Sequence, residues 1–325
     1  MIRRSGLVLL ALFTSGCYFN LDLDVGSLTR VSALHEVTVF GDDDDSPKLA
    51  MIEITGLISD AAVRSTFGAE RPSSVARLRE ALKLAADDED VLGLILRIRS
   101  PGGTVAASET LHHLIQNYKE ETGQPVVAFF QGIAASGGYY AAMAADEIVA
   151  HPTAITGSIG VIMAGFNVSK LMDRFGIGDQ TITSGAFKDS GTPLRAMRDE
   201  ERAYLQQVVD ELFARFVEVV NEGRPELDAA AIASLADGRI FTASQAHELG
   251  LVDSIGHLED AVSALEMRAE VKDAQVIRYQ RDGEYRENLY SRSSGSPTTV
   301  VDVKLLSFDR DRLEPGFYYL WPLGQ

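Results

Sequence analysis

The chain has 325 residues, of which 46% are hydrophobic and 24% charged, as is ordinary for a globular protein. Its formal net charge of -17 excludes nucleic-acid binding through a basic surface, because phosphate contacts need clustered Lys and Arg. The one cysteine, Cys17, excludes an internal disulfide, and no Cys/His cluster has the spacing of zinc ligands. We therefore expect no metal site.

The N-terminus has the features of a secretory signal over residues 1–17. Two arginines precede an apolar run over residues 7–13, and Ser15 and Gly16 stand directly before Cys17. The run is too short to span a bilayer as a permanent helix. The last residues resemble a bacterial lipobox, which implies cleavage before Cys17 and attachment of lipid to it. The alternative is a plain signal peptide with an incidental cysteine.

A lipidated Cys17 predicts a lipoprotein of the bacterial cell envelope, anchored to a membrane and facing the extracytoplasmic side. Residues 18–48 are then expected to form a tether. They include the acidic run 42–45, followed by Ser46 and Pro47. A block of like charges with turn residues is usually solvated and irregular, so this segment is interpreted as a linker.

From residue 49 the pattern alternates between strands and helices. In chain order it predicts a strand over 49–58, a helix over 73–86, a strand over 91–98, a helix over 104–121, a strand over 125–130, a helix over 135–145, a strand over 147–150, a helix over 167–175, a strand over 179–183, and helices over 198–222, 243–249 and 258–268. Strands separated by helices predict right-handed βαβ units and a parallel sheet covered by helices. The expected fold is a single α/β domain over residues 49–270.

Residues 271–325 are predicted to be a C-terminal extension. Residues 291–299 are rich in Ser, Pro and Thr, which is typical of a flexible linker. The chain then carries an aromatic cluster over residues 317–321. Because a disordered tail rarely has such aromatic density, we expect this cluster to pack on the body or on a neighbouring subunit near the substrate groove.

Four short segments follow predicted strands, where parallel α/β folds place their sites. Paired glycines expose backbone N–H groups that can stabilise an oxyanion, and a serine amid small residues at a helix start exposes its hydroxyl. A lysine amine acts as a base when desolvation favours its neutral form. Each segment alone is also an ordinary turn, N-cap or surface group. The segments are residues 100–103, 132–140, 156–160 and 184–189.

Together and in this order, the four segments resemble the signal peptide peptidase (SppA) family of serine peptidases. The resemblance implies that Ser136 is the nucleophile and Lys188 the general base. It implies that backbone N–H groups of Gly103 and Gly137 form the oxyanion hole. It also implies that Ser158 holds the lysine.

The resemblance covers roughly residues 49–267. It implies the Clp protease and crotonase fold, in which stacked βαβ units surround a spiral of strands. It implies an endopeptidase that needs no cofactor, forms an acyl-enzyme and hydrolyses hydrophobic peptides such as cleaved signal peptides. Family members often form ring-like oligomers, so a homo-oligomer is expected.

Three alternatives stay open at this stage. A Ser-His peptidase would use His151, which follows a predicted strand but lies well short of the offset usual in Clp-type peptidases. An enzyme acting on acyl-CoA is disfavoured by secretion, because acyl-CoA is cytosolic. A non-catalytic lipoprotein scaffold on a peptidase fold predicts that Ser136 or Lys188 is missing, and both are present.

Overall fold

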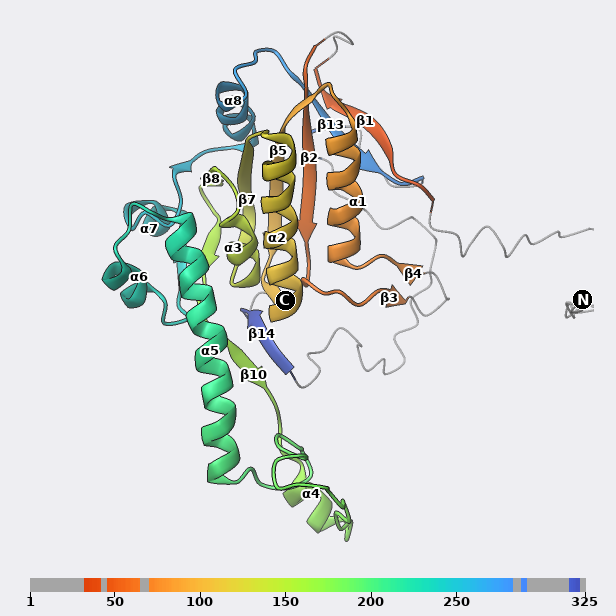
Figure 1. Ribbon diagram of the computed structural model, residues 1–325, viewed down its shortest axis with the longest axis vertical. Coiled ribbons are helices and arrows are strands. Elements are labelled where there is room, and N and C mark those ends of the chain that lie inside the picture. The colour runs from red at the N-terminus through yellow and green to blue at the C-terminus, as the bar shows by residue number, and fades with distance from the viewer. Residues whose placement is uncertain (1–31, 42–45, 65–69, 283–287, 291–315, 322–325) are drawn as a thin grey trace, which may run out of the picture.

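The computed structural model describes residues 32–41, 46–64, 70–282, 288–290 and 316–321 (Figure 1). The predicted signal peptide with Cys17, the acidic run 42–45 and the predicted linker 291–299 lie outside the described residues.

The described residues contain a main sheet of nine strands that run mostly parallel. Its order is β1-β13-β2-β5-β7-β8-β12, in which only β1 is antiparallel to its neighbour, and β9 joins β7 to β11 beside this path. The parallel α/β sheet predicted from the sequence is thereby confirmed. The strands are β1 (His35–Phe40), β2 (Lys48–Thr55), β5 (Val91–Ser100), β7 (Val126–Ala135), β8 (Glu147–Ala150), β9 (Ile155–Gly157), β11 (Ile240–Thr242), β12 (Ser254–Ile255) and β13 (Gln275–Gln280).

Two smaller sheets and the helices complete the described fold. The second sheet joins β10 (Ile162–Ala164), β14 (Gly316–Leu320) and β6 (Gly102–Thr104), and the third joins β3 (Val63–Arg64) and β4 (Glu70–Arg71). The helices are α1 (Ser74–Asp87), α2 (Val105–Thr122), α3 (Gly137–Ala142), α4 (Ser169–Arg174), α5 (Asp199–Gly223), α6 (Ala229–Leu235), α7 (Ala243–Glu248) and α8 (Leu258–Arg268).

The core has two layers because side chains alternate across the central strands. On β7, Val126, Ala128 and Phe130 pack with the layer that contains α1, α2 and α3, whereas Val127 and Phe129 pack with α8 on the opposite face. Figure 1 shows α1, α2 and α3 side by side in front of the sheet. Both faces of the central strands are therefore buried, which accounts for their near-continuous apolar sequence.

The range predicted for the domain, residues 49–270, is too short at both ends. Strand β1 comes from the predicted tether, and β13 comes from the predicted C-terminal extension, yet the two pair with each other in the main sheet. Strand β13 also pairs parallel to β2. The signal was weak because β1 is a short edge strand whose residues are mostly exposed.

The strand predicted over residues 179–183 is wrong. These residues form no strand, and the Ile182 side chain is 97% exposed. The Asp179 side chain accepts hydrogen bonds from the backbone N–H and the hydroxyl of Thr181, at 2.9 and 2.6 Å, which stabilises a local turn in place of a strand.

Residues 165–198 form a projection that we call the arm. It contains α4 and lies beside the N-terminal end of α5, away from the main sheet (Figure 1). Its link to the body is made by α5 and by β10, which pairs with β14. The arm explains why the strand prediction failed. The apolar residues in this segment are exposed on a projection, whereas the prediction assumed that they are buried in a sheet.

Candidate active site

Ser136 stands at the junction between β7 and α3, in a strained backbone conformation. Its φ is 53° and its ψ is -115°, a combination that costs a non-glycine residue about 1–3 kcal/mol. Backbone hydrogen bonds hold it there: Ser136 N–H donates to the Gly157 carbonyl at 2.7 Å, and Tyr140 N–H donates to the Ser136 carbonyl at 2.8 Å. The surrounding fold therefore imposes this conformation on the serine.

The Ser136 hydroxyl is buried and has no hydrogen-bond partner among the described residues. Leaving a buried hydroxyl unpaired costs about 1–3 kcal/mol. Strain and an unpaired polar group at one residue are typical of an active site, where stability is sacrificed for reactivity.

Two glycine segments lie beside this serine because they tolerate close backbone approach. A Cβ on Gly103 would stand 1.8 Å from the Ile58 carbonyl oxygen, and a Cβ on Gly137 would stand 2.2 Å from Ser108 Oγ. The Gly102 N–H donates to Ser100 Oγ at 3.1 Å, so it is already engaged. Gly103 and Gly137 are thus required as glycines, and they lie on the two segments from which oxyanion donors were expected.

Ser158 lies next to Ser136 at the ends of two parallel strands. The register pairs Ala135 of β7 with Gly157 of β9, so the two serines follow adjacent paired residues. Ser158 is buried, has a φ of 52°, and its N–H donates to the Arg239 carbonyl at 2.7 Å. The fold therefore brings the second and third motifs together, as expected for a common site.

The aromatic end of the chain lies against the same glycines. Strand β14 pairs antiparallel with β6, with Tyr319 opposite Gly103, and its other edge pairs with β10. The Tyr319 carbonyl oxygen and the Gly137 nitrogen lie 2.0 and 2.7 Å from the point that a Cβ on Gly102 would occupy. A peptide carbonyl is therefore already present beside Gly102 and Gly137. The expectation that this cluster packs on the body of the protein agrees with this placement.

The Tyr319 side chain fills an aromatic pocket below the site. Its ring stacks on Tyr140 at 5.0 Å between centroids and lies 4.6 Å from Phe216, and its hydroxyl donates to the Leu212 carbonyl at 2.8 Å. His112 meets Tyr140 edge-on, and burial lowers the pKa of His112 to about 4, so it is neutral at pH 7. The surroundings of Tyr319 are thus aromatic and accommodate a large side chain with one polar end.

Lys188 is not brought to this cluster within one chain. It lies on the arm with an exposed side chain, and no hydrogen bond joins it to Ser136 among the described residues. The expectation that it follows a strand was wrong, because residues 179–183 form no strand.

His151 does not contact Ser136 either. Its ring packs edge-on against Phe129 and His257, and its Nδ1 shares a 2.8 Å hydrogen bond with Thr153. Because Phe129 belongs to the α8 layer of the core, these contacts direct the His151 ring away from the layer that holds Tyr140.

Sequence reasoning missed the residues that line this site from elsewhere in the chain. Ser108 of α2 and Phe216 of α5 gave no motif, since they sit on ordinary amphipathic helices. Tyr140 had a weak signal, because it ends the small-residue motif of Ser136. No described group of three or more His, Cys, Asp or Glu side chains is arranged to hold a metal ion.

Comparison with known proteins identifies relatives over most of the chain. Residues 118–272 match the model of peptidase family S49. The chain is 35% identical over 281 residues to an Enterococcus faecium protein named "Putative signal peptide peptidase SppA", covering 84% of this chain and 81% of that protein. It is 30% identical over 220 residues to Protease 4 of Haemophilus influenzae, covering 67% of this chain but 34% of that longer protein. A chloroplastic serine protease SPPA of Arabidopsis thaliana is 31% identical over 261 residues, covering 79% of this chain and 37% of the relative.

Within the described residues, no helix combines the length and apolar character needed to cross a membrane.

Proposed function

Because this chain belongs to peptidase family S49 and is a serine peptidase with the Clp protease and crotonase-like fold, we propose that Ser136 is its nucleophile and Lys188 its general base. The observation that carries the proposal is the buried, unpartnered Ser136 hydroxyl at a strained strand end, with Gly103 and Gly137 beside it. A non-catalytic scaffold would have no reason to keep this destabilising arrangement.

The reaction follows from these groups. Neutral Lys188 takes the proton of the Ser136 hydroxyl while Oγ attacks the scissile carbonyl carbon. The N–H groups of Gly103 and Gly137 stabilise the negative oxygen of the tetrahedral intermediate. The carbon–nitrogen bond breaks as protonated Lys188 gives its proton to the leaving amine. Water then hydrolyses the acyl-enzyme, again with Lys188 as base. Ser158 is proposed to orient the lysine amine.

Strand β14 supports an extended, apolar peptide as the substrate. It lies antiparallel to β6, and Tyr319 fills the aromatic pocket while its carbonyl lies beside Gly102. Strand addition of this kind binds a peptide through its main chain and selects side chains through pockets. We therefore propose that the enzyme is an endopeptidase for hydrophobic peptides, among them cleaved signal peptides.

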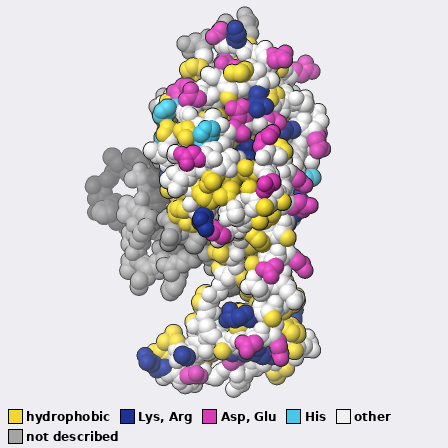
Figure 2. Space-filling view, turned by 90° about the vertical axis from the view of Figure 1, so that its left-hand side faces the viewer, with side chains coloured by type: hydrophobic (Ala, Val, Ile, Leu, Met, Phe, Trp, Pro, Cys, Tyr) yellow, Lys and Arg dark blue, Asp and Glu magenta, His cyan; other side chains and the backbone are white. Residues whose placement is uncertain are grey.

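The arm supports a homo-oligomer in which Lys188 reaches the Ser136 of a neighbouring copy. Clustered exposed apolar side chains mark interaction surfaces. Figure 2 shows hydrophobic side chains among charged ones at the lower end of the molecule. A second copy is the partner that fits, because the same arm carries the proposed base, and no described residue of the same chain forms a hydrogen bond with the Ser136 hydroxyl. The large hydrophobic residues of the arm that are at least half exposed are Phe166, Leu171, Phe175, Ile177, Ile182 and Phe187.

Joint refolding of two inactive variants tests this arrangement. Ser136→Ala and Lys188→Ala, each inactive alone, are refolded from urea separately and as an equimolar mixture, then assayed on an apolar fluorogenic peptide. Random assembly of shared sites is expected to give about a quarter of the wild-type activity in the mixture, since about a quarter of neighbouring pairs combine both intact residues. A mixture as inactive as its components would contradict delivery of Lys188 between chains. Wild-type activity of Lys188→Ala alone would contradict the dyad itself.

We also propose that lipid on Cys17 anchors the enzyme to a membrane of the bacterial envelope, with the peptidase on the extracytoplasmic side. Support comes from the signal-like sequence of residues 1–17. Cys17→Ala is expected to move the full-length protein from the membrane to the soluble fraction, and mass spectrometry should detect acyl chains on Cys17 only in the wild type. Retention of unacylated wild type on membranes would contradict the lipid anchor.

A further inference from the structure

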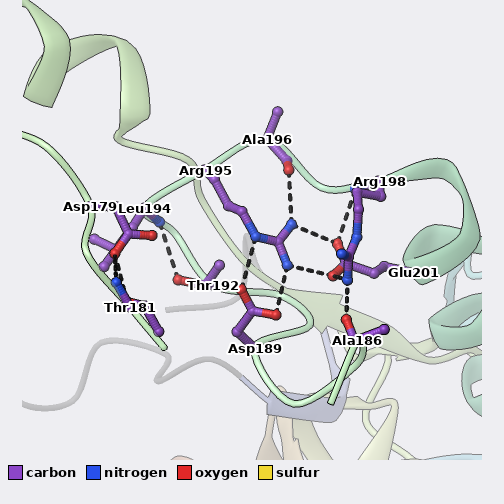
Figure 3. A network of polar contacts seen from close by, with 10 residues as sticks. All are labelled: Asp179, Thr181, Ala186, Asp189, Thr192, Leu194, Arg195, Ala196, Arg198 and Glu201. Carbon is purple, nitrogen blue, oxygen red and sulfur yellow. Dashed lines mark hydrogen bonds and ion pairs between the residues drawn. The ribbon is translucent and has the colours of Figure 1, made fainter. Parts of the chain in front are cut away.

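The loop that carries Lys188 is tied to the start of α5 by a network of ion pairs (Figure 3). Arg195 Nε donates to Oδ2 of Asp189 at 2.9 Å, and Asp189 directly follows Lys188. Arg198 donates to the carbonyl oxygen of Ala186, two residues before Lys188. Arginine side chains therefore bond to the loop on both sides of the lysine, Arg198 before it and Arg195 after it.

Both arginines converge on Glu201 in the first turn of α5, whose side chain is fully buried. Arg195 Nη1 donates to Glu201 Oε2 at 2.9 Å, and the Arg198 backbone N–H donates to the same oxygen at 3.0 Å. The hydrogen bond from Arg195 lowers the pKa of Glu201 to about 2 and also lowers the pKa of Asp189. Both carboxyl groups of the network therefore stay ionised at neutral pH and below it, so the ion pairs persist there.

Apolar packing and a turn add to this restraint. The Phe187 ring lies 5.6 Å from the Tyr204 ring of α5, and the Lys188 N–H donates to the Gly185 carbonyl at 3.1 Å. The Lys188 side chain itself stays exposed. The backbone of the loop is fixed while the amine can reach outward.

We propose that Arg195 and Glu201 are positioning residues for Lys188, which hold its loop so that the amine can meet the Ser136 hydroxyl. The inference rests on the proposed Ser136–Lys188 dyad. A general base must lie about 2.6–3.2 Å from the oxygen that it deprotonates. A displacement of about 1 Å in such a geometry can cost about a hundredfold in rate. Since many surrounding arm side chains are exposed, the network fixes a loop on the surface rather than completing a core.

The test compares Arg195→Ala, Arg195→Lys and Glu201→Gln with wild type, each alone and on a Lys188→Ala background. Arg268→Ala is the control, because Arg268 of α8 forms an ion pair with Glu147 of β8 at 2.7 Å, which lies away from the arm and is more exposed than the pair of Arg195 with Glu201. The substrate is a p-nitrophenyl ester of a blocked apolar amino acid, whose acylation can be measured in slow variants. Light scattering after size exclusion reports assembly, and circular dichroism reports folding.

Arg195→Ala is expected to lower kcat about 10- to 100-fold with KM within about twofold, whereas Arg268→Ala keeps wild-type values. Arg195→Lys and Glu201→Gln should fall between these limits, and no variant should change assembly. On the Lys188→Ala background, Arg195→Ala should cost nothing more, because residues that act through one another are not additive.

Three results would overturn the inference. If Lys188→Ala is inactive but Arg195→Ala keeps the wild-type kcat, the network does not position the base and the dyad stands. If Arg195→Ala costs the same factor with and without Lys188, or acts by dissociating the assembly, its role is structural. If Lys188→Ala keeps wild-type activity, the dyad itself fails and the positioning role fails with it.

Discussion

Replacing Ser136 with alanine is expected to lower peptide turnover by about four to six orders of magnitude, because it removes the atom that forms the acyl-enzyme. The measurement is the initial rate on an apolar fluorogenic peptide, made with the protein lacking residues 1–17. Ser234→Ala is the control, since Ser234 is exposed on α6 and its hydroxyl bonds only to the local Ala231 carbonyl. Equal activity of Ser136→Ala and wild type would remove Ser136 from the mechanism.

The same substitution is expected to leave the fold intact and to keep or raise its stability. Serine and alanine share the Cβ atom, so the strain at a φ of 53° is unchanged. The Ser136 hydroxyl has no partner among the described residues, so its removal breaks no hydrogen bond there and relieves a buried unpaired group. Urea unfolding should give a free energy of unfolding equal to that of wild type or up to about 1 kcal/mol higher. A clear loss of stability would indicate that the hydroxyl has a structural partner after all.

Tyr319→Ala is expected to destabilise the protein by about 3–5 kcal/mol, the range found when buried large aromatic side chains are truncated. Tyr319 is fully buried, its ring stacks on Tyr140 and lies tilted 4.6 Å from Phe216, and its hydroxyl donates to the Leu212 carbonyl. Removing the ring leaves a cavity between α3 and α5, so the loss includes the transfer of the ring and the cavity that remains.

Two variants separate the contributions to this effect. Tyr319→Phe keeps the ring and loses the hydrogen bond, so it should cost about 0.5–1.5 kcal/mol. Tyr290→Ala, at an aromatic residue that is 53% exposed, should change stability by about 0.5 kcal/mol or less. Chemical denaturation of the three variants checks the order. If Tyr319→Ala were as mild as Tyr290→Ala, β14 would not be docked on the body in solution.

The site illustrates how stability and reactivity compete at single residues. Ser136 and Ser158 both have positive φ, and Gly103 and Gly137 are packed so closely that a methyl group would meet backbone or hydroxyl oxygen. The extensive core formed by the central strands and helices α1, α2 and α3 stabilises the fold enough to maintain this strain. The strain is therefore confined to a few residues of the site, whereas the packing that offsets it is spread over the whole core.

Most of the longer elements from β2 to α4 were predicted because their signals are local, whereas the short strands β3, β4, β6, β9 and β10 were not predicted. Strands β5 and β7 are apolar runs that would be buried wherever the sheet lay, and α1 and α2 have periodicity together with capping residues, Ser73 and Thr104. The motif order along these elements also predicted Ser136, Gly137 and Gly103 as site residues, and the fold brings their segments together. A resemblance of motifs was needed to assign them roles, because each motif alone is an ordinary turn or cap.

The arm could not be predicted from these signals. Its segment from residue 179 to 183 was predicted to be a strand, but it pairs with no strand among the described residues, and Ile182 is left exposed. The ion pairs that hold the Lys188 loop have no signal in the sequence either. Asp, Arg and Glu are common residue types, and the convergence of Asp189, Arg195 and Glu201 depends on how the loop folds back onto α5.

The sequence by itself therefore determined the α/β class and the succession of the central strands and helices along the chain, and it supplied the serine and glycine segments proposed for the site. The tertiary structure alone decided that β1 and β13 join the main sheet, that β14 lies between β6 and β10 at the site, and that Lys188 is carried on an arm away from Ser136. The physical reason is the range of the interactions. Periodicity and helix caps act over a few residues, whereas the pairing of β14 with β6 joins segments more than 200 residues apart. Strands of three to five residues are too short to specify a partner by their own sequence, so their pairing depends on where the rest of the fold places them.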